Sequence, residues 1–170
     1  MRILMILTAG SVGRASLGLT LDQLIEAYYL LLDSGTEVVI ASSQGEAGAF
    51  RRGRARSTKD PPFIQRFWKD RGARDAINDT LRIEQICPED FDAAICIGVL
   101  ETPSHTADVQ AVLLLLTALL AGGKPIAIVP GEIEFAPHNS FDGLLIAGDN
   151  VRAPCLAARA ILAALNQPAL

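Results

Sequence analysis

The side chains best suited to covalent chemistry in this sequence are its three cysteines, Cys87, Cys96 and Cys155. They are scattered and show no C-x-x-C spacing, which argues against a disulfide framework and against a zinc site. Cys96 stands between two isoleucines, so we expect a buried structural thiol. Cys155 follows Pro154 in the first turn of a predicted helix, where the helix dipole favours a thiolate. Cys155 is therefore the candidate reactive thiol, although the sequence places no histidine or acid beside it.

Acid/base chemistry has one further candidate pair, Glu101 and His105, which share a predicted loop. A carboxylate can orient an imidazole that moves a proton, although two polar side chains in a loop are more often simply solvated. His138 is expected to be structural or exposed. We predict no metal site and no cofactor.

Two loops have compositions that could contact anions. Residues 8–18 are rich in small residues, but their glycine spacing is neither G-x-G-x-x-G nor G-x-x-x-x-G-K-[ST], so we favour a flexible strand-to-helix loop over a phosphate site. The loop from Arg51 to Lys59 carries a run of five basic residues. We interpret it as a solvated loop, with an anion or partner contact as the alternative.

Composition narrows the class of protein. The chain has 170 residues, of which half are hydrophobic and 20% charged, as in one globular domain with a sizeable core. The net charge of −4 argues against a general nucleic-acid binder. No apolar run has the length of a membrane span. The apolar N-terminus is short and lacks an A-x-A site, so it fits a first strand better than a signal peptide. We predict a cytoplasmic protein.

Residues 92–131 form the unit that must position any chemistry. Two short apolar runs, 93–97 and 126–129, bracket a long apolar helix, which is the pattern of a βαβ unit in a parallel sheet buried on both faces. Ligands of such sheets bind at the carboxyl ends of the strands. The sequence therefore places a candidate pocket just after residues 97 and 129.

The remaining segments complete an α/β fold. A T-x-x-Q capping box from Thr20 to Gln23 opens a helix that Gly35 ends, and a strand at 37–41 follows. A helix begins at residues 60–62 and breaks at Gly72, before a short helix at 73–79. Asp142-Gly143 predicts a hairpin over 139–147, and Pro154 opens a last helix reaching about residue 165. Its predicted apolar face is Leu156, Ala160, Ile161, Ala164 and Leu165. The predicted sheet core is Ile3, Leu4, Ile6, Val38, Ile40, Ile95, Ile97, Ile126 and Ile128.

The central helix predicts a subunit contact. Asp108 is its expected N-cap, and residues 109–121 are apolar nearly all round. Such a helix is buried on several sides, either in a larger core or at an interface. For a chain of 170 residues we favour a homodimer.

The order and wording of these segments resemble the ThiJ/PfpI family of the class I glutamine amidotransferase-like superfamily. The resemblance covers most of the chain and rests on RILMILT, DSGTEVVIAS, FWKDRGARDAINDTLRIEQICPEDFDAAICIG, GGKPIAIV and FAPHNSFDGLLIAGDN. It implies a single domain over residues 1–170 with a flavodoxin-like fold, a mainly parallel sheet with helices on both faces and a C-terminal β-hairpin. Relatives are often dimeric.

The resemblance also implies functional positions that this sequence fills differently. The family's nucleophilic cysteine follows the KPIAIV strand, where this chain has Pro130, and the elbow helix after it is missing. The family's acid position in the first helix corresponds to Gln23, and the glycine-rich oxyanion turn corresponds to residues 98–101. The candidate pocket is Gln23, Gly98, Val99, Glu101, His105, Pro130 and Glu132.

These departures favour a non-catalytic ThiJ/PfpI-like protein with a ligand-binding or scaffold role. The alternative is a small hydrolase or lyase, of amidase, peptidase or glyoxalase type, that uses a relocated group such as Cys155 or the Glu101–His105 pair. Partners expected are a second copy of the chain and a small molecule at the strand ends, with no nucleic acid and no membrane.

Overall fold

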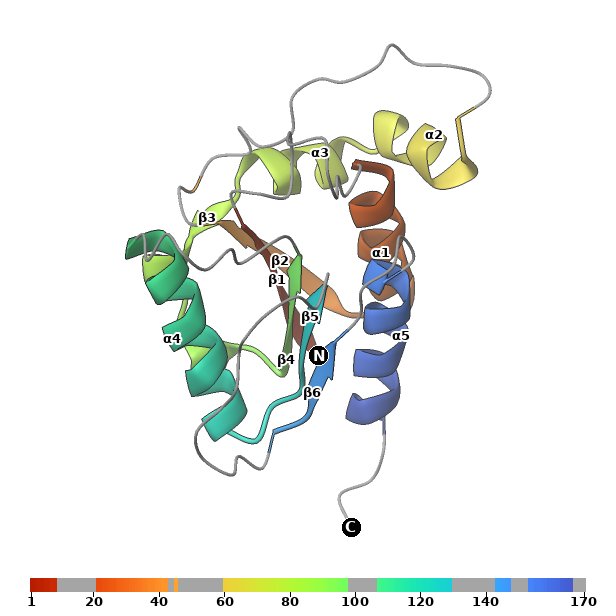
Figure 1. The fold of residues 1–170 in the computed structure, drawn as a ribbon. Helices are drawn as coiled ribbons and strands as arrows, with labels where there is room; N and C mark the ends of the chain where they lie inside the picture. The colour runs from red at the N-terminus through yellow and green to blue at the C-terminus, as the bar shows by residue number, and fades with distance from the viewer. Residues whose placement is uncertain are drawn as a thin grey trace.

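The computed structural model describes residues 1–8, 21–42, 45, 60–97, 107–129, 143–147 and 153–166. These residues form a six-stranded sheet in the order β3-β2-β1-β4-β5-β6, in which every adjacent pair of strands is parallel (Figure 1). The strands are β1 (Arg2–Leu7), β2 (Glu37–Ser42), β3 (Leu81–Arg82), β4 (Ala93–Ile97), β5 (Ile126–Val129) and β6 (Leu145–Ala147). The helices are α1 (Leu21–Asp33), α2 (Pro62–Lys69), α3 (Arg71–Asn78), α4 (Ala107–Ala121) and α5 (Ala153–Leu165), with short 3-10 turns η2 (Ile83–Gln85) and η3 (Pro88–Asp90).

The predicted α/β fold is confirmed. The central strands β1, β4 and β5 are buried along nearly their whole length because helices cover both faces, which explains their uninterrupted apolar runs. All the predicted core residues are buried except Val38, which is half-buried. Val38 lies near the start of β2, and β3 pairs only with the last two residues of that strand, so the start of β2 lies at an edge.

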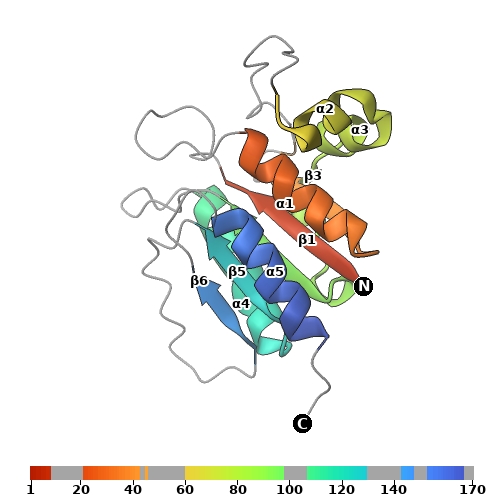
Figure 2. The same ribbon diagram turned by 90° about the vertical axis from the view of Figure 1, so that its right-hand side faces the viewer.

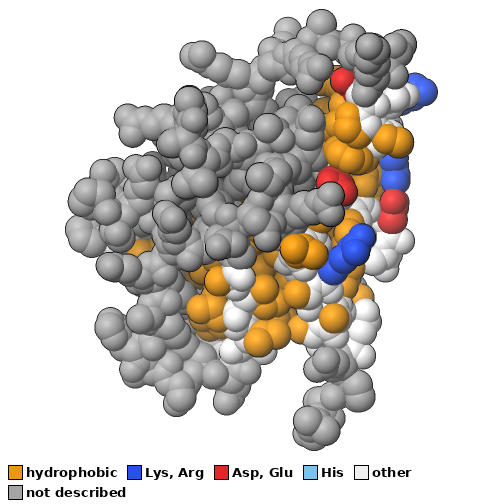
Figure 3. All heavy atoms as spheres, turned by 45° about the vertical axis from the view of Figure 1, so that its right-hand side comes forward, with side chains coloured by type: hydrophobic (Ala, Val, Ile, Leu, Met, Phe, Trp, Pro, Cys, Tyr) orange, Lys and Arg blue, Asp and Glu red, His pale blue; other side chains and the backbone are white. Residues whose placement is uncertain are grey.

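The helices form two unequal layers on the sheet. One face packs against α1 and α5, which lie side by side, with α2 and α3 beside α1 (Figures 1 and 2). The other face packs against α4 and the turns η2 and η3. On the side of α1 and α5, hydrophobic side chains reach the surface with charged side chains among them (Figure 3). None of the described helices is long and apolar enough to cross a membrane.

The break between α2 and α3 lies at Asp70 and not, as predicted, at Gly72. The backbone of Asp70 is extended, with φ −85° and ψ 103°, and its Oδ1 accepts a hydrogen bond of 3.0 Å from the N–H of Ala73. Asp70 is thus the N-cap of α3, and Gly72 lies inside that helix. The prediction failed because a glycine breaks a helix less strongly than an aspartate that satisfies the free N–H groups of the next one.

Two predictions about α4 and α5 are corrected. Because α4 begins at Ala107, Asp108 lies inside its first turn and is not the N-cap. In α5, Leu156 is 52% exposed, contrary to the predicted apolar face. The residues of α5 that are buried are Ala153, Pro154, Ala157, Ala158 and Ile161. Alanine is abundant on every side of α5, so the hydrophobic pattern does not fix which side faces the sheet.

At two positions the structure explains why the residue is a glycine. Gly35 has φ 81°, as predicted for the left-handed residue that ends α1. Gly143 packs against the end of α4, where an added Cβ would lie 2.8 Å from the carbonyl oxygen of Leu120. β6 follows Gly143 and pairs in parallel with β5, while the first arm of the predicted hairpin, residues 139–141, lies outside the described residues. The hairpin itself and the Thr20 capping box stay predictions.

Candidate functional site

The carboxyl ends of the parallel strands meet at one edge of the sheet. Among the described residues, β1, β2, β4 and β5 end there at Leu7, Ser42, Ile97 and Val129. The chain moves from β1 through β2 to β3 in one direction, and from β4 through β5 to β6 in the other. The strand order therefore reverses between β1 and β4. In open α/β sheets, ligands bind in the crevice outside the strand ends at such a switch point.

The backbone at the switch point is well ordered by hydrogen bonding. The N–H of Thr8 donates to the carbonyl oxygen of Ile97 over 3.2 Å, which continues the pairing of β1 and β4 to their ends. Thr8 is 5% exposed. The loop predicted over residues 8–18 and the predicted loop of Glu101 and His105 follow directly after these two strand ends in the chain. The structure therefore places their starting points side by side.

Most of the predicted pocket residues come shortly after β4 or β5 in the chain. β4 ends directly before Gly98, and β5 ends directly before Pro130. Gly98, Val99, Glu101, His105, Pro130 and Glu132 themselves lie outside the described residues, as does His138. Gln23 is in the first turn of α1. Their contacts stay predictions, and only the strand and helix ends that carry them are fixed.

Cys96 is a buried structural thiol, as predicted. It lies in β4 with no exposed surface and packs in the cluster that β4 shares with α4. Burial raises the pKa of the Cys96 thiol to about 12, because a thiolate would lose its hydration. Cys96 therefore has neither access nor charge for nucleophilic chemistry.

Cys155 has an acidic neighbour that sequence analysis missed. It lies half-buried in the first turn of α5, and Glu26 of α1 reaches it across the contact between the two helices. Burial, then the charge of Glu26 and a side-chain hydrogen bond with it, raise the pKa of the Cys155 thiol to about 12, although Arg159 acts in the opposite direction. Glu26 and Cys155 are far apart in sequence, so only the packing of α1 on α5 reveals the pair. The predicted activation by the helix terminus is outweighed.

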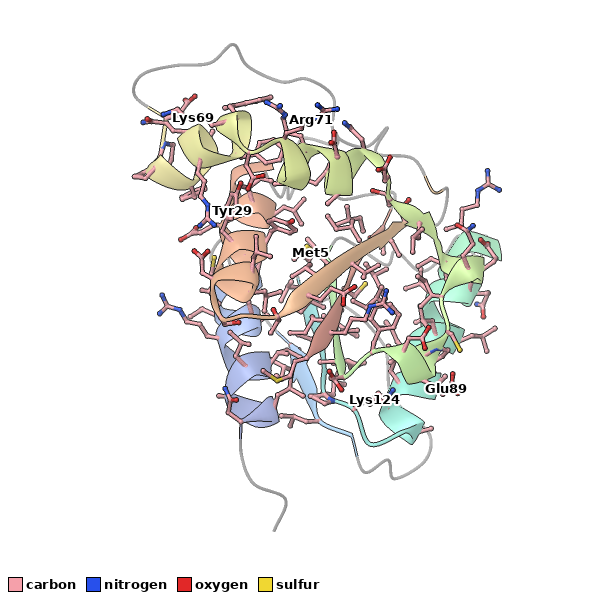
Figure 4. All side chains as sticks on the ribbon, turned by 180° about the vertical axis from the view of Figure 1, so that it is seen from behind. Met5, Tyr29, Lys69, Arg71, Glu89 and Lys124 are labelled. Carbon is pink, nitrogen blue, oxygen red and sulfur yellow. The ribbon has the colours of Figure 1, made fainter. Side chains whose placement is uncertain are left out.

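Cys87 also meets a carboxylate. Its exposed Sγ lies 3.0 Å from Oε2 of Glu89 and donates to it, which raises the pKa of the Cys87 thiol and lowers the pKa of the Glu89 carboxyl. Glu89 lies beside Lys124 near the end of α4 (Figure 4). All three thiols of the chain are therefore more weakly acidic than an ordinary cysteine.

A polar cluster joins α1 to the α2–α3 pair. The hydroxyl of Tyr29 donates to Oδ2 of Asp70 over 3.1 Å, and the guanidinium of Arg66 lies 4.0 Å from the centre of the Tyr29 ring. Arg66 also donates to Oδ2 of Asp33 over 2.7 Å. Burial and the bond to Asp70 raise the pKa of Tyr29 (labelled in Figure 4). These contacts fix α2 and α3 against α1 and have a structural role.

The described part of the chain contains no cluster of side chains that could hold a metal ion. No group of three or more histidine, cysteine, aspartate or glutamate side chains gathers there. Among the residues that the structure describes, carboxylates lie beside thiols in two pairs, Glu26 with Cys155 and Glu89 with Cys87. Two ligands do not complete the four-coordinate site of a structural zinc ion.

Solved structures with this arrangement are found at low sequence identity. Glyoxalase III from Candida albicans is 10% identical with a TM-score of 0.64, and the match covers 96% of this chain and 96% of that chain. A ThiJ/PfpI domain protein from Brachyspira murdochii is 13% identical with a TM-score of 0.55, over 99% and 98% of the two chains. The 24-kDa rapid encystment protein of Francisella tularensis is 13% identical with a TM-score of 0.63, over 98% and 99%. Neither a protein-family model nor a curated protein sequence matches the chain.

These matches define the class of fold. The parallel six-stranded sheet covered by helices on both faces is the flavodoxin-like α/β fold of ThiJ/PfpI proteins. The chain is structurally similar to members of that family, so the resemblance inferred from its segments is confirmed for the fold.

Proposed function

We propose that this chain is a non-catalytic ThiJ/PfpI-like protein with a ligand-binding or scaffold role. The observation that carries the proposal is the state of its thiols. A thiol reacts as a nucleophile in its thiolate form. With a pKa of about 12, as for Cys96 and Cys155, only about one thiol in 10⁵ is ionised at pH 7. Cys87 is shifted in the same direction. A thiol-dependent enzyme needs the opposite shift.

The sequence at the strand ends supports the same proposal. β5 ends at Val129, and the next residue is Pro130, whose side chain has no nucleophilic atom. Gln23 occupies the position that corresponds to the family's acid, and an amide cannot exchange a proton at neutral pH. The segment after β4 retains only its first glycine, Gly98, of the family's oxyanion turn. A nucleophile, an acid and oxyanion donors act together, and each is replaced in this sequence.

The switch point between β1 and β4 is the place we assign to a ligand. There the ends of two neighbouring strands, β1 and β4, are held together by the bond from Thr8 to Ile97, and β2 and β5 lie on opposite sides of this pair in the sheet. We also propose a cytoplasmic location, because the three cysteines are unpaired in the structure, as is usual in a reducing compartment.

The competing proposal is a small hydrolase or lyase that uses a relocated group. Cys155 is the weaker form of this alternative, because Glu26 and burial keep its thiol protonated. The Glu101–His105 pair is the stronger form, since both residues come shortly after β4 in the chain, and β4 ends at the edge of the sheet where a ligand is expected.

Thiol reactivity and turnover together test the proposal. Iodoacetamide labelling is followed site by site by mass spectrometry from pH 6 to 9, and we expect no labelling faster than that of an unactivated thiol at any cysteine. Conversion of methylglyoxal to lactate is assayed because one structural neighbour is a glyoxalase III, and hydrolysis of amide substrates is assayed beside it. We expect background rates.

Two variants separate the alternatives. Turnover that is lost in a Cys87, Cys96 and Cys155 triple alanine variant identifies a relocated cysteine. Turnover that survives there but is lost in His105→Ala identifies the Glu101–His105 pair. Either result overturns the non-catalytic proposal.

A further inference from the structure

We draw no further inference here: the strongest candidate, the basic stretch from Arg51 to Lys59 that precedes α2 in the chain, lies outside the described residues, and nothing in the structure shows what its cations contact.

Discussion

The two faces of the sheet are covered in different ways. On one face, α1 and α5 lie side by side and α2 and α3 pack beside α1, with polar contacts between helices. On the other face, α4 is the long helix. Thr117 donates to the helix's own backbone, and Lys124, which follows the helix, donates to the carbonyl oxygen of Pro88. The first face is joined by side-chain interactions between its helices, whereas on the second face the outer side of α4 carries no charged side chain from Gln110 to Gly123.

The close packing of β6 on α4 gives the largest expected effect on folding. In Gly143→Ala the added Cβ would lie 2.7 to 2.9 Å from backbone atoms of Lys124 and Leu120, which cannot move without shifting α4. We expect the free energy of unfolding to fall by about 1–3 kcal/mol, as for other overpacked sites. Urea unfolding of the variant measures this.

Gly72→Ala is the matched control for that substitution. Gly72 lies inside α3, and the nearest atom to an added Cβ is Oδ1 of Asp70 at 3.5 Å. Alanine in a helix interior should raise the free energy of unfolding by about 0.5–1 kcal/mol. If both variants change the free energy of unfolding in the same direction, the result contradicts the close contact of Gly143 with α4.

The polar cluster that joins α1 to α2 and α3 through Tyr29 and Asp70 gives a smaller effect. Tyr29→Phe removes the hydrogen bond to Asp70 and should lower the free energy of unfolding by about 1 kcal/mol. Tyr28→Phe is the control, because the phenol that donates to Asp70 is that of Tyr29, whereas Tyr28 feels Asp70 only through its charge. A loss of stability in Tyr28→Phe equal to that in Tyr29→Phe would contradict the role of the bond between Tyr29 and Asp70.

The same tyrosine predicts a pH dependence. Folding raises the pKa of Tyr29 above its usual value near 10, so the neutral phenol is favoured in the folded state. Its contribution to stability is fully present below pH 10 and is lost as the pH rises beyond that value, because the unfolded chain then ionises first. We expect stability to fall less steeply above pH 10 in Tyr29→Phe than in the wild type, as measured by urea unfolding.

The smallest effect concerns the thiol between α1 and α5. Glu26→Gln removes the carboxylate that helps to keep Cys155 protonated, so the pKa of Cys155 should fall and its alkylation by iodoacetamide near pH 8.5 should become severalfold faster. Glu89→Gln is the matched control and should accelerate labelling of Cys87 while leaving Cys155 unchanged. Equal acceleration of Cys155 in both variants would show that long-range charge, and not contact with Glu26, sets its reactivity.

From the sequence, most of the candidate site could be predicted only as a location in the fold. The apolar runs at 93–97 and 126–129 are long enough to identify buried parallel strands, and with them the edge of the sheet where a ligand binds. The pairing of Glu26 with Cys155 could not be anticipated, because the two residues come from helices separated by most of the chain. The switch point between β1 and β4 likewise depends on strand order, which local periodicity does not encode.

The sequence by itself determined the elements of this protein, namely the central strands, the glycine end of α1 and the long apolar helix α4. It did so because burial on both faces demands continuous apolar residues, and because a positive φ favours glycine. Only the tertiary structure decided which side of α5 faces the sheet, because an alanine-rich helix presents little contrast between its sides. The tertiary structure also decided that α4 has one exposed side, since the sequence of a helix does not specify how many neighbouring elements pack against it.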